Sequence, residues 1–383
     1  MALFGHSGSQ APQLIHSSVI LIAILCVNLR LKFPANIRVS MQLKQRINAF
    51  VQVGNFILRH FSTKRKSEEA NLHLGLGELI KTAQIYNGWF IEEFANHALK
   101  NIGNVLTQQD IETLCQKLPA ENSNPKTVAV ICAGNIPMVG FHDILCILLA
   151  GDTVLIKLST DDNVLLPFFL KLLVHYEPEF DTQIRLSDGR LTNFDAIIAT
   201  GSNNTANYFD YYFSKYPSII RKNRSSLAVL TGKESSEQLG ELGKDIFYYY
   251  GLGCRNVSKL LVPQDYNFNH FFESIFKYAY LADNKKYANN YEYNRTIYLM
   301  ATADFLDNNF LIIKPDNQIH APISVVFYER YKNQEEVNDY LEKNRPEIQC
   351  IVGQDYIPFG NSQSPVITDF ADDINTMNFL VNL

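Results

Sequence analysis

The chain has 383 residues, of which 46% are hydrophobic and 19% charged, as in ordinary globular proteins with one large or two medium domains. Its net charge of −5, without a basic stripe interleaved with aromatic residues, argues against a nucleic-acid binder. The six cysteines lack CxxC spacing and the histidines form no HExxH pair, so we expect no disulfide framework and no metal site. Cysteines scattered in this way favour a reducing compartment, which we take to be the cytoplasm.

Residues 1–40 differ in character from the rest of the chain. Their apolar core, residues 19–27, is shorter than the roughly 20 residues that span a bilayer. No positive charge precedes it, as one would in a signal peptide. Met41 then opens an amphipathic helical pattern. We therefore expect Met41 to be the true start, residues 1–40 to be a misassigned extension or disordered, and no stable membrane insertion; a membrane anchor is the alternative.

Hydrophobic periodicity predicts helices first and then an alternation of strands and helices, which is typical of a parallel α/β sheet. The first helices are predicted at residues 43–61, 76–82, 89–102 and 107–118. The alternating region has predicted strands at 127–132, 153–158, 182–186, 195–200 and 226–230, and helices at 138–150, 163–175, 204–216 and 236–250. Beyond it, strands are predicted at 257–262, 310–314, 323–328 and 348–352, and helices at 269–282 and 335–344.

Two polar turns stand at the carboxyl ends of predicted strands, where open α/β sheets bind ligands. Residues 133–137 contain Asn135, and Gly201 and Ser202 follow the strand at 195–200. The helix that begins after each turn would direct free amides toward a phosphate. Neither turn has the GxGxxG pattern, so each alone is also consistent with an ordinary loop.

Cys254 follows the turn Gly251-Leu-Gly253 and precedes the apolar run 257–262. Because glycines adopt backbone angles that other residues avoid, the turn could present the thiol instead of burying it. A presented thiol is a candidate nucleophile. Most free cysteines are small buried hydrophobic residues, and this segment alone favours that interpretation.

Short motifs recur in a fixed order from the first strand to the C terminus. They are Gly134-Asn-Ile-Pro137, Lys157-Leu-Ser-Thr160, Thr200-Gly-Ser202, Gly251-Leu-Gly-Cys254, Gln318-Ile-His-Ala-Pro322 and the tail that starts at Phe359-Gly-Asn-Ser-Gln-Ser-Pro365. In this order they resemble the motifs of the aldehyde dehydrogenase superfamily. Within it they are most similar to the acyl-CoA reductase family, the LuxC-like fatty acid reductases. The resemblance covers residues 41–383.

This resemblance implies an α/β, aldehyde-dehydrogenase-like fold. It assigns residues 41–235 to a Rossmann-type NAD(P)-binding domain with N-terminal helices. Residues 236–355 would form a smaller α/β catalytic domain that carries the cysteine, and residues 356–383 a C-terminal segment.

The resemblance also implies catalytic residues. Cys254 would be the nucleophile, and Asn135 would direct its side-chain amide at the oxyanion, with the Cys254 backbone N–H as second donor. Asn135 could otherwise be a turn-forming residue. His320 would supply a proton or contact the substrate, and a structural histidine is an equal alternative.

The implied cofactor residues lie in three of the motifs. Lys157 would contact the adenosine ribose or its phosphate, and Thr160 stands where the family pattern has a glutamate. Gly201 and Ser202 would line the cofactor near its pyrophosphate and nicotinamide. Gln318 would replace the glutamate that holds the nicotinamide ribose.

Two departures from the superfamily pattern narrow the chemistry. Residues 219–230, where hydrolytic relatives carry a glutamate, contain no carboxylate, and Glu234 comes only after the strand. Without a base to activate water, an acyl-enzyme is not readily hydrolysed. Thr160 removes a carboxylate that would repel a 2′-phosphate, so we expect NADPH as cofactor.

We therefore expect an NADPH-dependent reductase that converts a fatty acyl-CoA or acyl-protein thioester to the aldehyde through an acyl-enzyme on Cys254. An NAD-linked aldehyde dehydrogenase is one alternative. A non-catalytic subunit that anchors an acyl-activating partner protein is another. The acyl chain length, the thioester carrier and whether the chain forms a homo-oligomer stay open.

Overall fold

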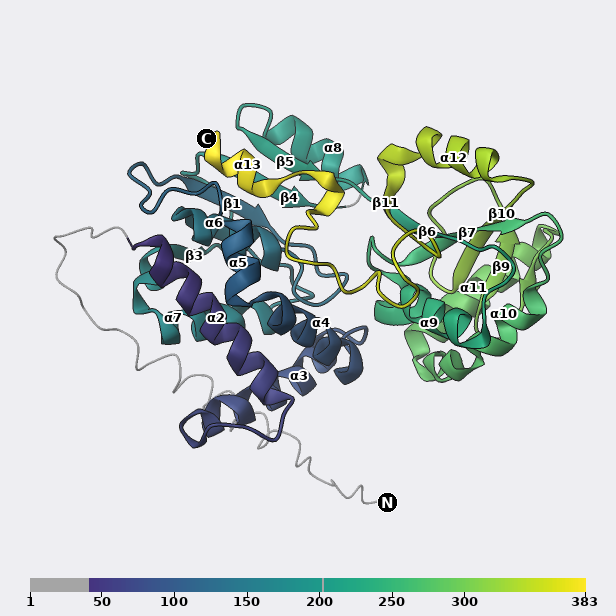
Figure 1. Cartoon of the computed structure of the whole chain (residues 1–383), viewed down its shortest axis with the longest axis horizontal. Coiled ribbons are helices and arrows are strands. Elements are labelled where there is room, and N and C mark those ends of the chain that lie inside the picture. Colours follow the sequence, from purple (N-terminus) through teal and green to yellow (C-terminus); the bar gives the residue numbers. More distant parts are fainter. Residues whose placement is uncertain (1–40, 202) are drawn as a thin grey trace, which may run out of the picture. The chain divides into compact units, whose positions relative to one another are not determined.

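The computed structural model of the protein describes residues 41–201 and 203–383 (Figure 1). The expectations for residues 1–40 and for Ser202 lie outside the described residues. Within the described ranges, no helix combines the length and the apolar character that a bilayer crossing demands.

The described chain begins with a group of helices, in agreement with the sequence pattern. They are α2 (Leu43–His60), α3 (Ala70–Tyr86), α4 (Glu92–Val105) and α5 (Gln108–Leu114). In α2, the buried residues Phe50, Val53 and Ile57 recur at helical spacing and form the face that packs against α4. The Thr107 side chain accepts a hydrogen bond from the Asp110 amide and caps the start of α5.

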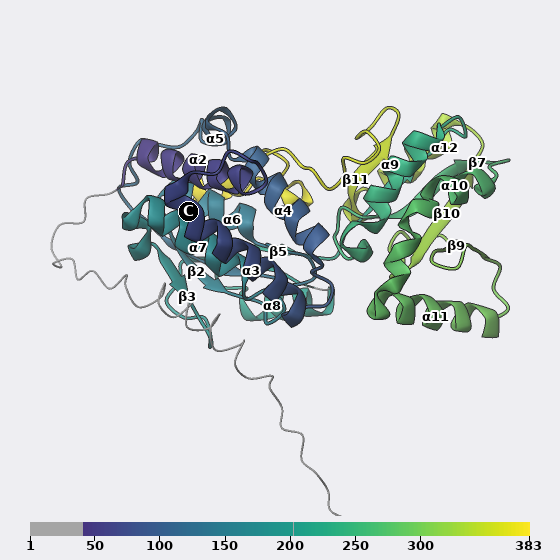
Figure 2. The same cartoon turned by 90° about the horizontal axis from the view of Figure 1, so that it is seen from below.

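The first sheet follows these helices, and all its strand pairs are parallel. Its strands are β1 (Thr127–Ile131), β2 (Thr153–Lys157), β3 (Ile184–Leu186), β4 (Ala196–Thr200) and β5 (Ser218–Arg221), in the order β3-β2-β1-β4-β5. The helices between them are α6 (Phe141–Ala150), α7 (Leu165–Tyr176) and α8 (Asn203–Tyr212). Helix α2 packs against α6 and α7, the helices that follow β1 and β2 (Figure 2). Because β1 lies between β2 and β4, the strand order reverses there, and ligands bind at the carboxyl ends of such strands.

The second sheet has the order β11-β6-β7-β10-β9-β8 and is parallel except at β8, which runs antiparallel to β9. Its strands are β6 (Ser225–Val229), β7 (Val257–Pro263), β8 (Leu306–Asp307), β9 (Ile312–Pro315), β10 (Val325–Tyr331) and β11 (Ile348–Gly353). The α-helices of this part are α9 (Ser236–Phe247), α10 (Phe268–Ile275), α11 (Lys285–Met300) and α12 (Gln334–Lys343). The last helix, α13 (Thr376–Val381), packs against α6 beside the first sheet.

Strand β6 shows where the chain passes from one sheet to the other. From the sequence, residues 226–230 are expected in the cofactor domain, which would end at residue 235. In the structure β6 pairs with β7 and β11, so it belongs to the second sheet. The passage between the sheets is therefore the short stretch 222–224 after β5.

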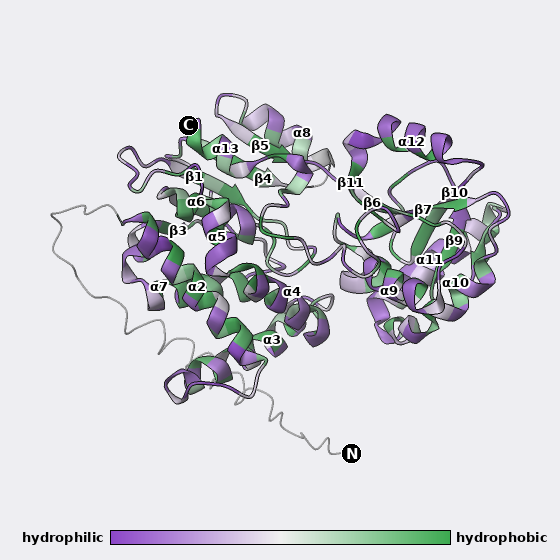
Figure 3. Cartoon of the chain, in the orientation of Figure 1, coloured by the Kyte–Doolittle hydropathy of each residue, from purple (hydrophilic) through white to green (hydrophobic). Residues whose placement is uncertain are grey.

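Each sheet has its own hydrophobic core. The cluster of the first sheet includes Val128 of β1 and Ile144 of α6, and that of the second includes Leu242 of α9 and Leu260 of β7. Strands of both sheets are largely hydrophobic, whereas α12 carries mostly hydrophilic residues and buries Val337 (Figure 3). The apolar cores thus fix the strands, and the polar motifs lie at the ends of these fixed strands.

Candidate active site

The turn before Cys254 has an unusual backbone. Tyr249, Tyr250 and Gly251 have φ angles of 53°, 55° and 76°, all in the left-handed region. Only glycine adopts this region without strain, so neighbouring contacts must hold the two tyrosines there. The Tyr249 hydroxyl bonds to Nδ1 of His97 at 2.9 Å, and the Tyr250 hydroxyl accepts from Asn284 at 3.0 Å. Strained residues of this kind cluster at functional sites.

Asn256 closes the turn that carries Cys254. Its side-chain Nδ2 donates to the carbonyls of Asp245 (3.0 Å), Ile246 (3.3 Å) and Tyr248 (2.9 Å), at the end of α9. Its Oδ1 accepts a hydrogen bond of 2.8 Å from the Gly253 N–H. The amide is 2% exposed, so its hydrogen bonds are made out of water. Asn256 was not identified from the sequence as a support of the cysteine turn.

Ser226 holds the other side of the turn. Its hydroxyl donates to the Cys254 carbonyl at 3.1 Å, and it lies 3.0 Å from the Cys350 sulfur on β11. Ser226 is completely buried. Ser226 of β6 therefore fixes the backbone carbonyl of Cys254. The backbone N–H of Cys254 has no acceptor among the described residues.

The Cys254 thiol is half-buried and protonated at neutral pH. Burial raises its pKa to about 11, and the nearby carboxylate of Asp372 raises it further. The cations Arg255 and Arg221 lower the pKa, but by less. Asp372 belongs to the tail motif but was given no role from the sequence, and it is held by Arg224 at 3.5 Å.

Asn135 meets the cysteine turn. Its Nδ2 donates to the carbonyl of Leu252 at 2.7 Å, two residues before Cys254. Asn135 is exposed, so the second N–H of its amide is accessible. Ile136 supports the approach, because a Cβ placed on Gly253 would lie 3.6 Å from its Cδ1. The structure thus brings together the first and fourth sequence motifs.

Asn87 joins the Asn135 turn to the loop after β2. Its Nδ2 donates to the carbonyls of Gly134 at 3.2 Å and Asp161 at 3.4 Å. A side chain on Gly134 would collide with Ser159, so glycine is required for this close approach. Asn87 lies outside the sequence motifs and was also missed.

The cofactor residues expected in the first sheet lie at the carboxyl ends of parallel strands. Lys157 ends β2, and its Nζ donates to the Gly189 carbonyl at 3.2 Å. Thr160 is exposed on the next loop and is followed by an exposed carboxylate, Asp161. Gly201 follows β4.

Gln318 and His320 lie after β9 of the second sheet. Gln318 is exposed, and its backbone N–H donates to Asp316 at 3.1 Å. Nδ1 of His320 lies 2.7 Å from the Ser225 hydroxyl, and burial lowers the pKa of the ring. In the part of the chain that the structure describes, no hydrogen bond or ion pair joins Gln318 to Lys157 or His320 to Cys254. The structure therefore links His320 to the cysteine site only through the neighbouring serines of β6.

Glu234 has a structural role. Its carboxylate accepts hydrogen bonds from the Thr231 N–H (2.6 Å), the Thr231 hydroxyl (2.8 Å) and the Gly232 N–H (3.0 Å). It thus closes the turn between β6 and α9 and is 8% exposed. The carboxylate that follows the strand is not free to activate water.

The C-terminal segment lies against the cysteine turn. Asp245 of α9 accepts from the backbone N–H groups of Gly360 at 2.6 Å and Ser362 at 2.8 Å. Arg255, the residue after Cys254, donates to the Ser362 carbonyl at 2.5 Å and lies 3.6 Å from Asp369. The tail motif is therefore part of the site. Over residues 41–201 and 203–383, no group of histidine, cysteine and carboxylate side chains is arranged to hold a metal ion.

A family match covers the centre of this arrangement. Residues 112–277 match the acyl-CoA reductase (LuxC) family, a span that includes Asn135, Lys157, Gly201 and Cys254. This stretch is therefore similar to acyl-CoA reductases of the LuxC type. The resemblance stated from the motifs is thereby confirmed, and Gln318 and His320 lie beyond the match. No curated protein matches the chain.

Solved structures show the same fold. An NAD-dependent aldehyde dehydrogenase from Sinorhizobium meliloti matches with a TM-score of 0.60 and 10% identity, over 82% of this chain and 70% of that chain. The aldehyde dehydrogenase KauB from Pseudomonas aeruginosa matches with a TM-score of 0.58 and 12% identity, over 82% and 72%. The P. syringae indole-3-acetaldehyde dehydrogenase AldA, in complex with NAD+ and IAA, matches with a TM-score of 0.57 and 12% identity, over 82% and 72%. The predicted aldehyde-dehydrogenase-like fold is confirmed. Fold and family match together support an oxidoreductase of aldehyde chemistry.

Proposed function

We propose that the protein reduces a fatty acyl thioester, carried by CoA or by a protein, to the aldehyde through an acyl-enzyme on Cys254. The observation that carries this proposal is the hydrogen bond from Asn135 to Leu252. This bond supports the proposal because it holds an amide donor at Leu252, two residues before the only cysteine of the sequence that follows a Gly-x-Gly turn. Acyl transfer needs a nucleophile and a hydrogen-bond donor for the oxyanion, and a thiol and an amide at one turn supply both.

In the first step the Cys254 sulfur attacks the thioester carbonyl. The new carbon–sulfur bond forms as the bond to the CoA sulfur breaks, and the thiol proton leaves with CoA. The oxyanion of the tetrahedral intermediate would accept from the second N–H of Asn135 and from the backbone N–H of Cys254. Each such donor contributes about 3–4 kcal/mol to transition-state stabilisation.

A nicotinamide cofactor fits the chemistry of the strand ends in the first sheet. Lys157 offers a cation for the adenosine-ribose phosphate, the exposed Thr160 offers a hydroxyl without negative charge, and Gly201 keeps the chain beyond β4 free of a side chain. Gln318 would hold the nicotinamide ribose, and Ser202 would lie near the pyrophosphate. NADPH bound there would supply the hydride that converts the acyl-enzyme to aldehyde. The thiohemiacetal anion would then collapse to the aldehyde and the Cys254 thiolate, which would take a proton from water to become the thiol again.

Reduction is favoured over hydrolysis by the placement of two carboxylates. Glu234 closes a turn beyond the carboxyl end of β6, whereas Ser226 holds the Cys254 carbonyl at the amino end of that strand. Asp372, which acts on the Cys254 thiol, is paired with Arg224. Neither is free to take a proton from water at the acyl-enzyme. An acyl group on Cys254 would therefore persist until it is reduced.

The test is consumption of NADPH with a long-chain acyl-CoA, followed at 340 nm. We expect turnover by the wild-type protein, a slower rate with NADH, and no turnover by Cys254→Ala. Absence of turnover with acyl-CoA and acyl-protein thioesters alike would refute the proposed reaction. Equal turnover by the Cys254→Ala variant would refute the assignment of the nucleophile.

A further inference from the structure

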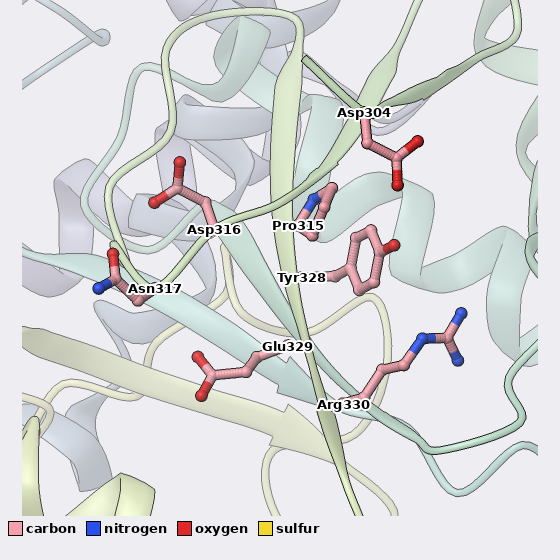
Figure 4. A pocket seen from close by; sticks show the side chains of 7 residues that line it. All are labelled: Asp304, Pro315, Asp316, Asn317, Tyr328, Glu329 and Arg330. Carbon is pink, nitrogen blue, oxygen red and sulfur yellow. The ribbon is translucent and has the colours of Figure 1, made fainter.

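The segment that carries Gln318 is held in place by polar contacts. It comprises residues 316–320 and connects β9 to the start of β10. A cavity of about 450 Å³ borders it and is lined by Asp304, Pro315, Asp316, Asn317, Tyr328, Glu329 and Arg330 (Figure 4). Asn317 and Gln318 are exposed. Packing therefore does not hold this side of the segment, and the contacts on its other side must fix it.

Lys259 provides the first of these contacts. It lies on β7, is 0% exposed, and directs its ammonium group at the carbonyl of Asp316. Glu329 of β10 supplies the countercharge at 3.1 Å, and the ring of Tyr340 lies 5.5 Å from the ammonium group. A buried ammonium group requires partners with good geometry, so the Asp316 carbonyl is a fixed point of the segment.

The far end of the segment is fixed by two serines. The Ser258 hydroxyl donates to the Ile319 carbonyl at 2.7 Å, and Ser225 bonds to His320 at 2.7 Å. Among the described residues, no hydrogen bond engages the side chain of Gln318, which lies between the two fixed ends. The segment is thus clamped at both ends and leaves Gln318 accessible.

We infer that Lys259, assisted by Ser258, is a positioning residue that sets where Gln318 meets the nicotinamide ribose. This inference rests on the proposed function. Cys254 lies five residues before Lys259, and β7 starts between them. The turn that precedes β7 therefore positions the nucleophile, and Lys259 within β7 positions the segment that faces the cofactor. Misplacement of Gln318 would affect reduction and leave acyl transfer intact.

The test compares two reactions in Lys259→Met, which keeps an unbranched side chain, one atom shorter, and removes its charge and its donors. We expect the KM for NADPH to rise about tenfold or more, because small displacements of a positioning group are costly. The rate of acylation of Cys254 by acyl-CoA without cofactor should stay within about twofold of wild type. Lys259→Arg, which keeps a charged donor, should recover part of the affinity.

Two further variants make the result specific. Lys81→Met is the matched control, because Lys81 pairs with Glu78 on the surface of α3 and its loss should leave both rates unchanged. Ser258→Ala removes one hydrogen bond at the other end of the segment and should raise the KM for NADPH by about two- to fivefold, even if Lys259→Met fails to fold.

Two outcomes would overturn the inference. One is wild-type KM for NADPH in both Lys259→Met and Ser258→Ala. The other is an equal loss of acylation and cofactor affinity, which would show a purely structural role. A wild-type protein that binds no NADPH would instead refute the proposed function itself.

Discussion

The side-chain amide of Asn135 donates to the main-chain carbonyl of Leu252 at 2.7 Å, although the two residues lie 117 positions apart. This bond joins the turn after β1 to the turn before β7, so each of the two sheets contributes one half of the candidate site. A donor fixed in this way needs little reorganisation when an oxyanion forms.

Replacement of Asn135 by alanine should therefore lower kcat by about 10²–10³ while NADPH binding stays nearly intact. Steady-state kinetics and cofactor fluorescence titration measure the two effects. Asn290→Ala is a suitable control, because the Asn290 amide donates to a carbonyl of its own helix, α11. If Asn135→Ala loses cofactor affinity in proportion to kcat, Asn135 is mainly a structural residue of its turn.

The reactivity of Cys254 should rise steeply with pH. Burial raises the pKa of its thiol to about 11, so the reactive thiolate is scarce at neutral pH and increases as pH approaches that value. We expect alkylation by iodoacetamide to accelerate about tenfold per pH unit from pH 7 to 9. Mass spectrometry of the Cys254 peptide gives the rate. A plateau below pH 8 would contradict a raised pKa.

Thr160 should contribute to the preference of the protein for NADPH over NADH. Thr160→Glu adds an exposed carboxylate beside the loop that carries Asp161. A unit charge about 4 Å from a phosphate in water costs about 1 kcal/mol, so the KM for NADPH should rise roughly fivefold and that for NADH should not. Thr182→Glu, in the 3-10 turn before β3, controls for added charge. No change in the ratio of the two KM values would remove Thr160 from the cofactor site.

The Asp245 carboxylate should affect stability between pH 4 and 6. Burial raises its pKa from 3.8 to about 6. The folded chain therefore takes up a proton more readily than the unfolded chain, and the resulting stability is present at low pH and lost as pH rises through about 6. Asp245→Asn removes this effect, so the difference in unfolding free energy between variant and wild type should change by up to about 3 kcal/mol over that range. Urea unfolding at pH 4.5, 5.5 and 7 measures it, and parallel curves would contradict the raised pKa.

The sequence pattern predicted β1, β2, β3 and β4 of the first sheet because buried parallel strands are continuous apolar runs, as in residues 127–132, but it missed the short edge strand β5. Helix α11 was missed. It is rich in asparagine, lysine and tyrosine, and it buries Tyr287, Tyr291 and Asn294 without an apolar stripe. Its start is set by Asn284, whose side chain accepts from the Lys286 and Tyr287 amides. Tertiary contacts, not periodicity, make this segment helical.

The motifs of the candidate site could be predicted from the sequence, but the residues that hold its turns by hydrogen bonds could not. Cys254 and Asn135 belong to short motifs and were found, whereas Asn256 and Asn87 act through hydrogen bonds to carbonyls distant in sequence. Such contacts depend on the fold and leave no local pattern. Lys259 is a similar case, because only the structure shows that it is buried and directed at Asp316.

The most direct measurement is the mass of the protein after incubation with a long-chain acyl-CoA in the absence of cofactor. The account predicts a single added acyl group on the peptide that contains Cys254, discharged as aldehyde when NADPH is supplied. The acyl group should be absent from Cys254→Ala and present in Cys350→Ala. Cys350 is the suitable control because its sulfur lies beside Ser226, the serine that also holds the Cys254 carbonyl. Acylation that persists in Cys254→Ala, or an acyl group released as free acid on addition of NADPH, would contradict the account.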